Sequence, residues 1–184
     1  MAHSDEQLML AFRAGDAAAF DRLYARYRAP LYRYVRRLCN DSPEAEELYQ
    51  DAWLRIIRSR SQWHSDAPVK PWLYRIAHNR VADFWRSSER RAAVMAFDEQ
   101  EAPDQANPGP GARTLLQDCI ARLKRLLGRL PEAQRSAFLL KEEAGLTLEQ
   151  IADCTGVGQE TVKSRLRYAL RALRKGLEGC HDTI

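Results

Sequence analysis

The chain has 184 residues, a net charge of +4 and a sequence pI near 9.0. Its apolar fraction of 45% is sufficient for a folded core, and no run approaches the roughly 20 apolar residues of a membrane-spanning helix. The first ten residues lack the basic and apolar segments of a secretory signal, so we expect a soluble, cytoplasmic protein with no membrane insertion.

Acidic and turn-forming residues gather in one segment near the middle of the chain. Residues 92–112 contain four acids and no Lys or Arg; because they contribute −4 to a total of +4, the rest of the chain carries +8. Three prolines and two glycines also fall within nine consecutive residues of this segment. This composition predicts a flexible acidic linker at 92–113, between a first domain at 1–91 and a second at 114–184.

Apolar residues recur at three- and four-residue steps through most of the remaining sequence, and alternating strand patterns are almost absent. Before the linker, this pattern predicts helices at 5–14, 16–39, 43–60 and 71–91, with a proline-rich loop at 61–70. Asp16 suits the N-cap of the second helix and Ser42 that of the third. After the linker, it predicts helices at 114–128, 131–143, 147–154 and 158–177. The predicted fold class is therefore all-α, with two small helical domains.

The last two predicted helices have the features of a helix-turn-helix. Ala152 is small enough for a close crossing, Gly156 tolerates a positive φ in the turn, and Val162 supplies an apolar inner face. Thr155 departs from the usual pattern, in which an apolar residue precedes the glycine. The buried stripe is expected to continue through Ile151, Val157, Leu166, Leu170, Leu173 and Leu177.

That stripe leaves polar side chains on the free side of the last helix, near its N-terminal end. A recognition helix presents such side chains to base edges in the major groove, with cations reaching the phosphates. A run of charges usually only solvates a surface, but here it coincides with a suitable turn and a buried stripe. We therefore predict duplex DNA contacts by Gln159, Glu160, Thr161, Lys163, Ser164, Arg165 and Arg167.

Aromatic and basic residues are interleaved between residues 61 and 86. Aromatic faces stack on unpaired bases for roughly 1–3 kcal/mol per base, and cations hold the phosphates beside them. This composition suits a melted DNA strand. Trp72, Ile76 and Phe84 share one helical face and are expected in the core, whereas Trp63 and His64 lie in the loop and are expected to be exposed.

The predicted helix at 43–60 carries side chains that the packing of a self-contained helical bundle does not explain. Leu48 and Ile57 suit a domain core, but Gln50, Asp51 and Trp53 are expected on an exposed face next to acidic residues. Such a helix can serve as a docking surface for a protein partner.

No residue pattern indicates catalysis or a cofactor. The four cysteines, Cys39, Cys119, Cys154 and Cys180, form no C-x-x-C pair and have no His at zinc-site spacing. The chain also lacks a phosphate-binding glycine loop and a nucleophile motif. We predict a protein that is not an enzyme and that uses no metal and no cofactor.

Three stretches in the same order resemble a bacterial RNA polymerase sigma factor of the extracytoplasmic-function (ECF) type of the sigma-70 family. They read "AEELYQDAWLRI", "PWLYRIAHNRVADFWR" and "LPEAQRSAFLLKEEAGLTLEQIADCTGVGQETVKSRLRYALRALRKGL". The resemblance covers about residues 5–91 and 114–177. It implies a sigma region 2 domain and a sigma region 4 domain, which together direct core polymerase to promoters.

The resemblance also implies a role for each segment. The beta-prime coiled coil of core RNA polymerase would be bound by Glu47, Gln50, Asp51, Trp53 and Leu54. The melted non-template strand of the −10 element would be read by Trp63, His64, Lys70, Arg75, His78, Asn79, Arg80, Asp83 and Arg86. The helix starting at Gln159 would read the −35 element as duplex, and the linker would run toward the RNA exit path. Further implied partners are the polymerase beta flap and an anti-sigma factor.

One alternative stays open at the level of sequence. A conventional helix-turn-helix regulator, with an N-terminal sensor or dimerisation domain, would bind intact duplex DNA without polymerase. The aromatic and basic segment at 61–72 favours the sigma-factor interpretation, because a duplex binder has little use for stacking groups.

Overall fold

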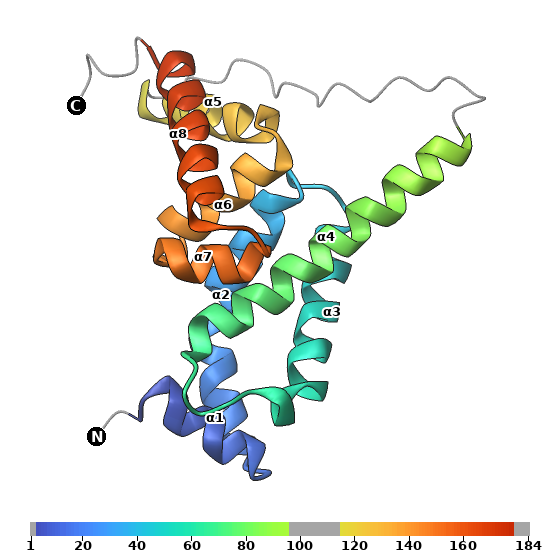
Figure 1. The fold of residues 1–184 in the computed structure, drawn as a ribbon, viewed down its shortest axis with the longest axis vertical. Helices are drawn as coiled ribbons and strands as arrows, with labels where there is room; N and C mark the ends of the chain where they lie inside the picture. The colour runs from blue at the N-terminus through green and yellow to red at the C-terminus, as the bar shows by residue number, and fades with distance from the viewer. Residues whose placement is uncertain (1–2, 96–114, 179–184) are drawn as a thin grey trace.

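The structure is a computed structural model that describes residues 3–95 and 115–178, and every regular element within these ranges is helical (Figure 1). The all-α prediction is therefore confirmed. The N-terminal unit consists of α1 (Asp5–Arg13), α2 (Ala17–Leu38), α3 (Ala45–Arg58), the short 3-10 helix η1 (Arg60–Gln62) and α4 (Val69–Met95). The C-terminal unit consists of α5 (Leu115–Arg129), α6 (Glu132–Glu142), α7 (Leu148–Thr155) and α8 (Gln159–Gly176).

Local sequence signals explain where the first helices begin. The carboxylate of Asp16 accepts hydrogen bonds from the backbone N–H groups of Ala18 and Ala19, at 2.9 and 3.2 Å, which confirms it as the N-cap of α2. Ser42 does not cap α3. Asn40 and Asp41 adopt left-handed φ values of 56° and 55°, and the turn that follows delays the helix until Ala45.

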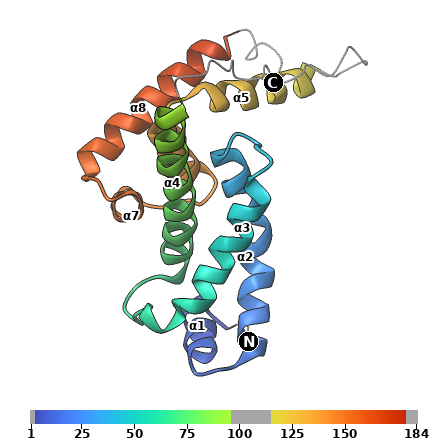
Figure 2. The same cartoon turned by 90° about the vertical axis from the view of Figure 1, so that its right-hand side faces the viewer.

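The core of the N-terminal unit lies between α2, α3 and α4. Figure 2 shows α2 and α3 side by side, with α1 across one end of the pair. Leu31 and Val35 of α2, Leu48 of α3 and Ala77 of α4 are all fully buried there. α4 continues to Met95, beyond the predicted end at Arg91, so the start expected for the linker falls within a helix.

In the C-terminal unit, α8 packs against α5, α6 and α7. The contact with α5 forms a small cluster of buried residues, Leu127, Leu130, Ala169 and Leu173. Gly176 lets the two helices approach closely, because a Cβ atom at this position would overlap the side chain of Leu126.

The two units share one continuous hydrophobic core. α4 lies against α7 and α2 lies against α6, and the main buried cluster includes Tyr34 and Ala77 from one unit together with Leu140 and Ile151 from the other. We call this contact the seam. Across the described helices, none combines the length and apolar character needed to cross a bilayer.

Candidate nucleic-acid interface

Three of the residues predicted to bind a melted strand form an accessible face on α4. Arg75, Asn79 and Arg86 are exposed. Their spacings of four and seven residues bring them to the same side of a helix with 3.6 residues per turn. The face combines two cations with an amide that can both donate and accept hydrogen bonds. It therefore suits contact with phosphates and base edges.

Asp83 organises the end of this face. Its carboxylate accepts a hydrogen bond from Arg86 at 2.5 Å and another from Arg55 of α3 at 3.0 Å. Partial burial raises the pKa of Asp83, but the hydrogen bonds from the two arginines outweigh it and the net shift is downward. The ionised carboxylate thus positions Arg86 rather than adding a free negative charge to the face.

Arg80 lies on another side of α4 and joins this helix to α3. Its Nε and Nη2 atoms donate to the carboxylate of Asp51 at 2.9 and 2.8 Å. Both nitrogens approach the same oxygen, Oδ2 of Asp51, so the contact is a charge-assisted pair with one acceptor atom. The sequence predicts that Asp51 contacts polymerase and that Arg80 contacts DNA. In this structure the two side chains bind each other instead.

The expected exposure of Trp63 is wrong. The indole is fully buried, and its Nε1–H donates to the carbonyl of Ala67 at 3.1 Å. Arg13 of α1 donates to the carbonyl of Trp63 at 2.8 Å. The loop folds back because η1 turns the chain after α3, which places the indole in the core as an anchor. His64, the next residue, is exposed as expected.

The predicted docking face on α3 is only partly present. Glu47, Gln50 and Leu54 are exposed, and Leu54 is among the few large apolar side chains at the described surface. Trp53 was expected on the same face but is buried. Its ring packs edge-on against Tyr24 at 4.9 Å and Phe20 at 6.0 Å, so aromatic contacts with α2 hold it in the core.

The helix-turn-helix forms as the sequence predicts. Thr147 caps α7 in a reciprocal pair with Gln150, and Gly156 ends the helix with a φ of 67°. Thr155 precedes that glycine without penalty, because its hydroxyl donates to the carbonyl of Ile151 at 2.8 Å. Ala152 and Val162 are buried at the crossing of α7 and α8.

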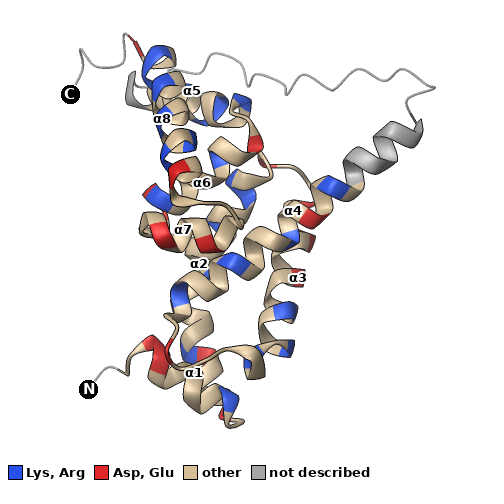
Figure 3. Ribbon diagram, viewed as in Figure 1, with Lys and Arg blue, Asp and Glu red and all other residues tan. Residues whose placement is uncertain are grey.

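The first turns of α8 present most of the predicted duplex-reading set to solvent. Figure 3 shows basic residues along the whole length of this helix. Lys163 pairs with Glu160 at 2.6 Å, an exposed contact that constrains both side chains little. Ser164 and Arg165 are partly covered. The exposed members are Gln159, Glu160, Thr161, Lys163 and Arg167.

The sequence missed a groove on α8. Leu170 was assigned to the buried stripe, but it is exposed, and the helix buries Ala169 instead. Leu148, Leu166 and Leu170 form the apolar floor of a groove of about 760 Å³, with Arg167 and Arg171 at its edge. Ala169 follows Val162 by seven residues, and this heptad spacing is the signal that identifies the buried line.

His78 was predicted to contact DNA but is buried in the seam, with 9% of its surface exposed. Its Nδ1 atom lies 3.0 Å from the Ser136 hydroxyl of α6 and 3.3 Å from the Tyr34 hydroxyl of α2. Burial, followed by the positive charge of Arg165, lowers the pKa of His78 to about 4. The imidazole is therefore neutral near pH 7, and its Nδ1 atom takes part in hydrogen bonding with both hydroxyls within the seam.

Other polar contacts cross the seam. Arg37 of α2 forms an ion pair with Glu143 at the end of α6. The Cys154 thiol of α7 donates to the carbonyl of Pro71 at 3.3 Å. Lys70 also lies at the seam, with its ammonium near Gly145 in the α6–α7 connection. In this arrangement Lys70 and His78 are thus on a contact surface, while Arg75, Asn79 and Arg86 remain accessible.

Comparison with known protein families matches both units. The family described as sigma-70 region 2 matches residues 23–91, and the family described as sigma-70, region 4 matches residues 126–175. The two units and their order thus define a sigma-70 family protein, which is a DNA-binding transcription initiation factor.

Individual relatives identify the group of sigma-70 family proteins to which the chain belongs. The ECF RNA polymerase sigma factor SigL of Mycobacterium tuberculosis is 34% identical over 166 residues, which cover 90% of this chain and 92% of the relative. The RNA polymerase sigma-H factor of Pseudomonas aeruginosa is 31% identical, with 95% of this chain and 94% of the relative covered. The chain belongs to the ECF RNA polymerase sigma factors, and it directs transcription from promoters.

Solved structures agree on the fold. The sigma factor RpoE of Bartonella quintana, in complex with the anti-sigma factor NepR, aligns with a TM-score of 0.71 at 24% identity, covering 86% of this chain and 96% of that one. CnrH, in complex with the cytosolic domain of CnrY, aligns with a TM-score of 0.69 at 21% identity, covering 95% and 97%.

Proposed function

We propose that the chain binds core RNA polymerase through the exposed face of α3, captures the melted −10 strand on α4, and reads the −35 element as duplex with α8. The observation that carries this proposal is the presence of two different cation-bearing faces on two units of one chain. Arg75, Asn79 and Arg86 make one face, and the exposed first turns of α8 make the other.

The two faces suit different forms of DNA. The start of α8 is a narrow, convex surface of the size that enters a major groove, and its polar side chains project from the helix end. The face on α4 is longer, and exposed His64 lies on the loop that precedes the helix. Imidazole and amide groups that lie beside a row of cationic side chains can hold unpaired bases. Promoter location and promoter opening are thereby assigned to separate units.

The docked arrangement is the closed form of the free protein in this proposal. His78 and Lys70 contact α6 and the α6–α7 connection here, so they become available to DNA only when the units separate. Core polymerase favours the separated form if it binds that form more tightly, since a partner shifts an equilibrium only by its differential affinity. Free protein is then a poor DNA binder.

Further contacts with polymerase and with a regulator belong to the same proposal. The apolar floor formed by Leu148, Leu166 and Leu170 suits an apolar helix of the beta flap. An anti-sigma factor is the expected inhibitor, and it would compete for faces that core polymerase uses. The protein acts in the cytoplasm, without catalysis of its own.

Run-off transcription tests the proposal. Purified chain is added to core RNA polymerase on a library of genomic promoter fragments, and transcripts are sequenced. We expect transcripts from a small set of start sites that core enzyme alone does not produce. The absence of such transcripts, combined with footprints on intact duplex by the free protein, would favour a conventional helix-turn-helix regulator instead.

A further inference from the structure

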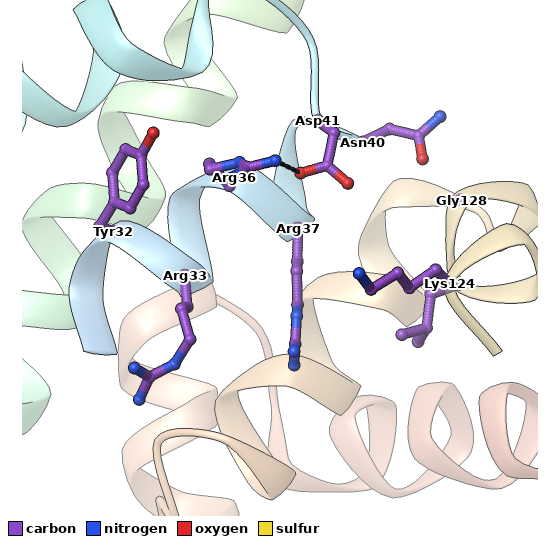
Figure 4. Close-up of a pocket in the computed structure, with 9 residues that line it drawn as sticks. Tyr32, Arg33, Arg36, Arg37, Asn40, Asp41, Lys124 and Gly128 are labelled. Carbon is purple, nitrogen blue, oxygen red and sulfur yellow. Dashed lines mark ion pairs between the residues drawn. The ribbon is translucent and has the colours of Figure 1, made fainter. Parts of the chain in front are cut away.

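A cationic pocket of about 210 Å³ lies at the seam, where the C-terminal end of α2 meets α5 (Figure 4). Its volume far exceeds the about 10–15 Å³ needed to hold one water molecule. Figure 4 shows the arginines projecting from α2 on one side and Lys124 projecting from α5 on the other. The pocket therefore exists only while the two units are docked.

Positive charge dominates the lining. Four cations, Arg33, Arg36, Arg37 and Lys124, face one carboxylate, that of Asp41. Arg36 pairs with Asp41 at 2.7 Å and lies 5.8 Å from the ring centre of Tyr32. Arg37 is paired with Glu143. Arg33 and Lys124 form no hydrogen bond or ion pair with any residue that the structure describes.

The position of α2 accounts for part of this charge but not for all of it. Cations in the last turn of a helix are stabilised by the macrodipole, which is sufficient reason for Arg36 and Arg37. It gives no reason for Lys124, which lies within α5 of the other unit. Arg36 and Arg37 are already paired with Asp41 and Glu143, so Arg33 and Lys124, one from each unit, are the cations whose charge a bound anion would compensate.

The carbonyl groups at the end of α2 are already paired, which reduces the repulsion that they exert on an anion. The carbonyl groups of Val35, Arg36 and Arg37 accept hydrogen bonds from the backbone N–H groups of Cys39, Asp41 and Asn40, at 2.9, 2.8 and 3.2 Å. These are the carbonyls that a helix normally leaves unpaired at its C-terminus. Two of these donors belong to the left-handed residues Asn40 and Asp41, which turn the chain here.

We propose that this pocket binds a phosphoanhydride group, as pyrophosphate or as the diphosphate end of a nucleotide, and that binding holds the two units together. Guanidinium groups bind phosphate oxygens in a forked geometry and an ammonium adds a point charge. An anion that contacts both Arg33 and Lys124 has to reach across the seam. This requirement favours a diphosphate over a single phosphate or a carboxylate.

Binding and docking are coupled by linkage. A ligand that contacts both units has its complete site only in the docked form, so it stabilises that form by an amount that grows with the logarithm of its concentration once this exceeds Kd. The consequence for transcription rests on the proposed function: a ligand that favours docking opposes assembly with core polymerase. The pocket is then an effector site through which a phosphorylated metabolite lowers sigma activity.

Titration calorimetry on the full chain tests the binding step, with inorganic pyrophosphate, ADP and GDP as probes and with AMP, GMP, sulfate and citrate for comparison. We expect one saturable site for the diphosphates. The double variant Arg33→Gln/Lys124→Gln should weaken binding by at least about tenfold, as expected for the loss of charge-assisted hydrogen bonds. The variant Arg22→Gln/Arg125→Gln removes the same charge at exposed positions outside the pocket and should bind within about twofold of the wild type.

If both double variants lose the same amount of affinity, or if binding follows anion charge without saturation, the proposed site is wrong and only general attraction to the charged surface remains. If pyrophosphate and AMP or GMP bind equally well, the diphosphate specificity is wrong. Binding by pyrophosphate but not by ADP or GDP would identify the free anion as the ligand.

Hydrogen exchange tests the coupling step without requiring any transcription. Pyrophosphate should slow amide exchange in the seam helices α4, α6 and α7 of the wild type and leave the Arg33→Gln/Lys124→Gln variant unchanged. Unchanged exchange in both proteins would overturn the coupling. Assembly with core polymerase is then measured by fluorescence anisotropy rather than by RNA synthesis, because pyrophosphate is a product of nucleotide incorporation. Failure of the ligand-free wild type to assemble would instead contradict the proposed function, whatever the calorimetry shows.

Discussion

The Nδ1 atom of His78 and the hydroxyl of Ser136 lie 3.0 Å apart although 58 residues separate them in the chain. This contact joins α4, which carries the proposed −10 face, to α6 of the C-terminal unit. Tyr34 of α2 approaches the same nitrogen at 3.3 Å. A histidine on the proposed strand-capturing helix is thus also part of the interface that closes the free protein.

Because His78 is buried and neutral, acid should weaken the docked structure. The pKa rises from about 4 in the folded protein toward 6.5 on unfolding, so the unfolded chain takes up a proton first as the pH falls. Stability contributed by the neutral imidazole is complete above pH 6.5 and is lost between 6.5 and 4. From pH 7.5 to pH 5 the expected loss is about 2 kcal/mol. Urea unfolding at the two pH values measures it.

The variant His78→Gln isolates this effect, since glutamine keeps a hydrogen-bonding group but does not titrate. The other side chains that face the imidazole are those of Tyr34, Ser136 and Arg165. The variant should therefore lose about 2 kcal/mol less than the wild type over the same interval. An identical pH dependence in both proteins would show that the seam does not depend on the neutral imidazole.

The structure predicts that Trp63 supports the fold. Replacement by Ala removes a fully buried indole and should cost about 3–5 kcal/mol of unfolding free energy, whereas His64→Ala at the exposed neighbour should stay within about 0.5 kcal/mol. Thermal or urea unfolding of the two variants provides the comparison. A stable Trp63→Ala protein that fails to open promoters would restore the original assignment of this residue to the DNA strand.

Most short-range signals in the sequence predicted the local structure correctly; Ser42 is the exception, because the left-handed residues Asn40 and Asp41 delay the start of α3. Asp16 capped its helix, Gly156 ended α7 at positive φ, and Ala152 and Val162 met at the crossing of the helix-turn-helix. Each depends on side chains within a few positions of one another, where backbone geometry is nearly determined.

Long-range packing was the part that the sequence did not reveal. Trp63 and Trp53 look accessible in a loop and on an acidic helix, but α1 and α2 cover them. The burial of His78 depends on α6, more than fifty residues away. Residue type alone does not separate a stacking aromatic from an anchoring one, because both present the same apolar faces; only the surrounding elements decide which it is.

Leu54 should be an important contact for core polymerase. It is 47% exposed on α3, and Leu10 on α1 is 45% exposed, which provides a matched control. Leu54→Glu is expected to weaken core binding at least about tenfold, as for a central interface residue, while Leu10→Glu leaves it within about twofold. Both variants should keep their unfolding free energy within about 0.5 kcal/mol. Anisotropy of labelled protein titrated with core enzyme measures the affinities, and equal effects would exclude α3 as the specific docking face.

The accessible face of α4 should govern strand opening. Arg75→Gln combined with Asn79→Ala removes a cation and an amide from that face without disturbing a buried contact. Holoenzyme should assemble normally, but permanganate reactivity of unpaired thymines at the promoter should fall by about tenfold or more. Arg28→Gln, which removes the same charge from the exposed surface of α2, serves as the control. Normal opening by the double variant would transfer the strand-binding role to another surface.

The turn of the helix-turn-helix can be tested without touching the recognition face. Gly156 has a φ of 67° and open space where a Cβ would project, so Gly156→Ala adds no collision and only the backbone penalty of about 1–2 kcal/mol. Gly158, at the N-cap of α8, has an ordinary φ of −69° and lacks a side-chain cap. Gly158→Ser should gain a few tenths of a kcal/mol by supplying one. If Gly156→Ala lowers the unfolding free energy and Gly158→Ser raises it, the left-handed turn is the element that sets α8 against α7. Changes of the same sign in both variants would contradict that assignment.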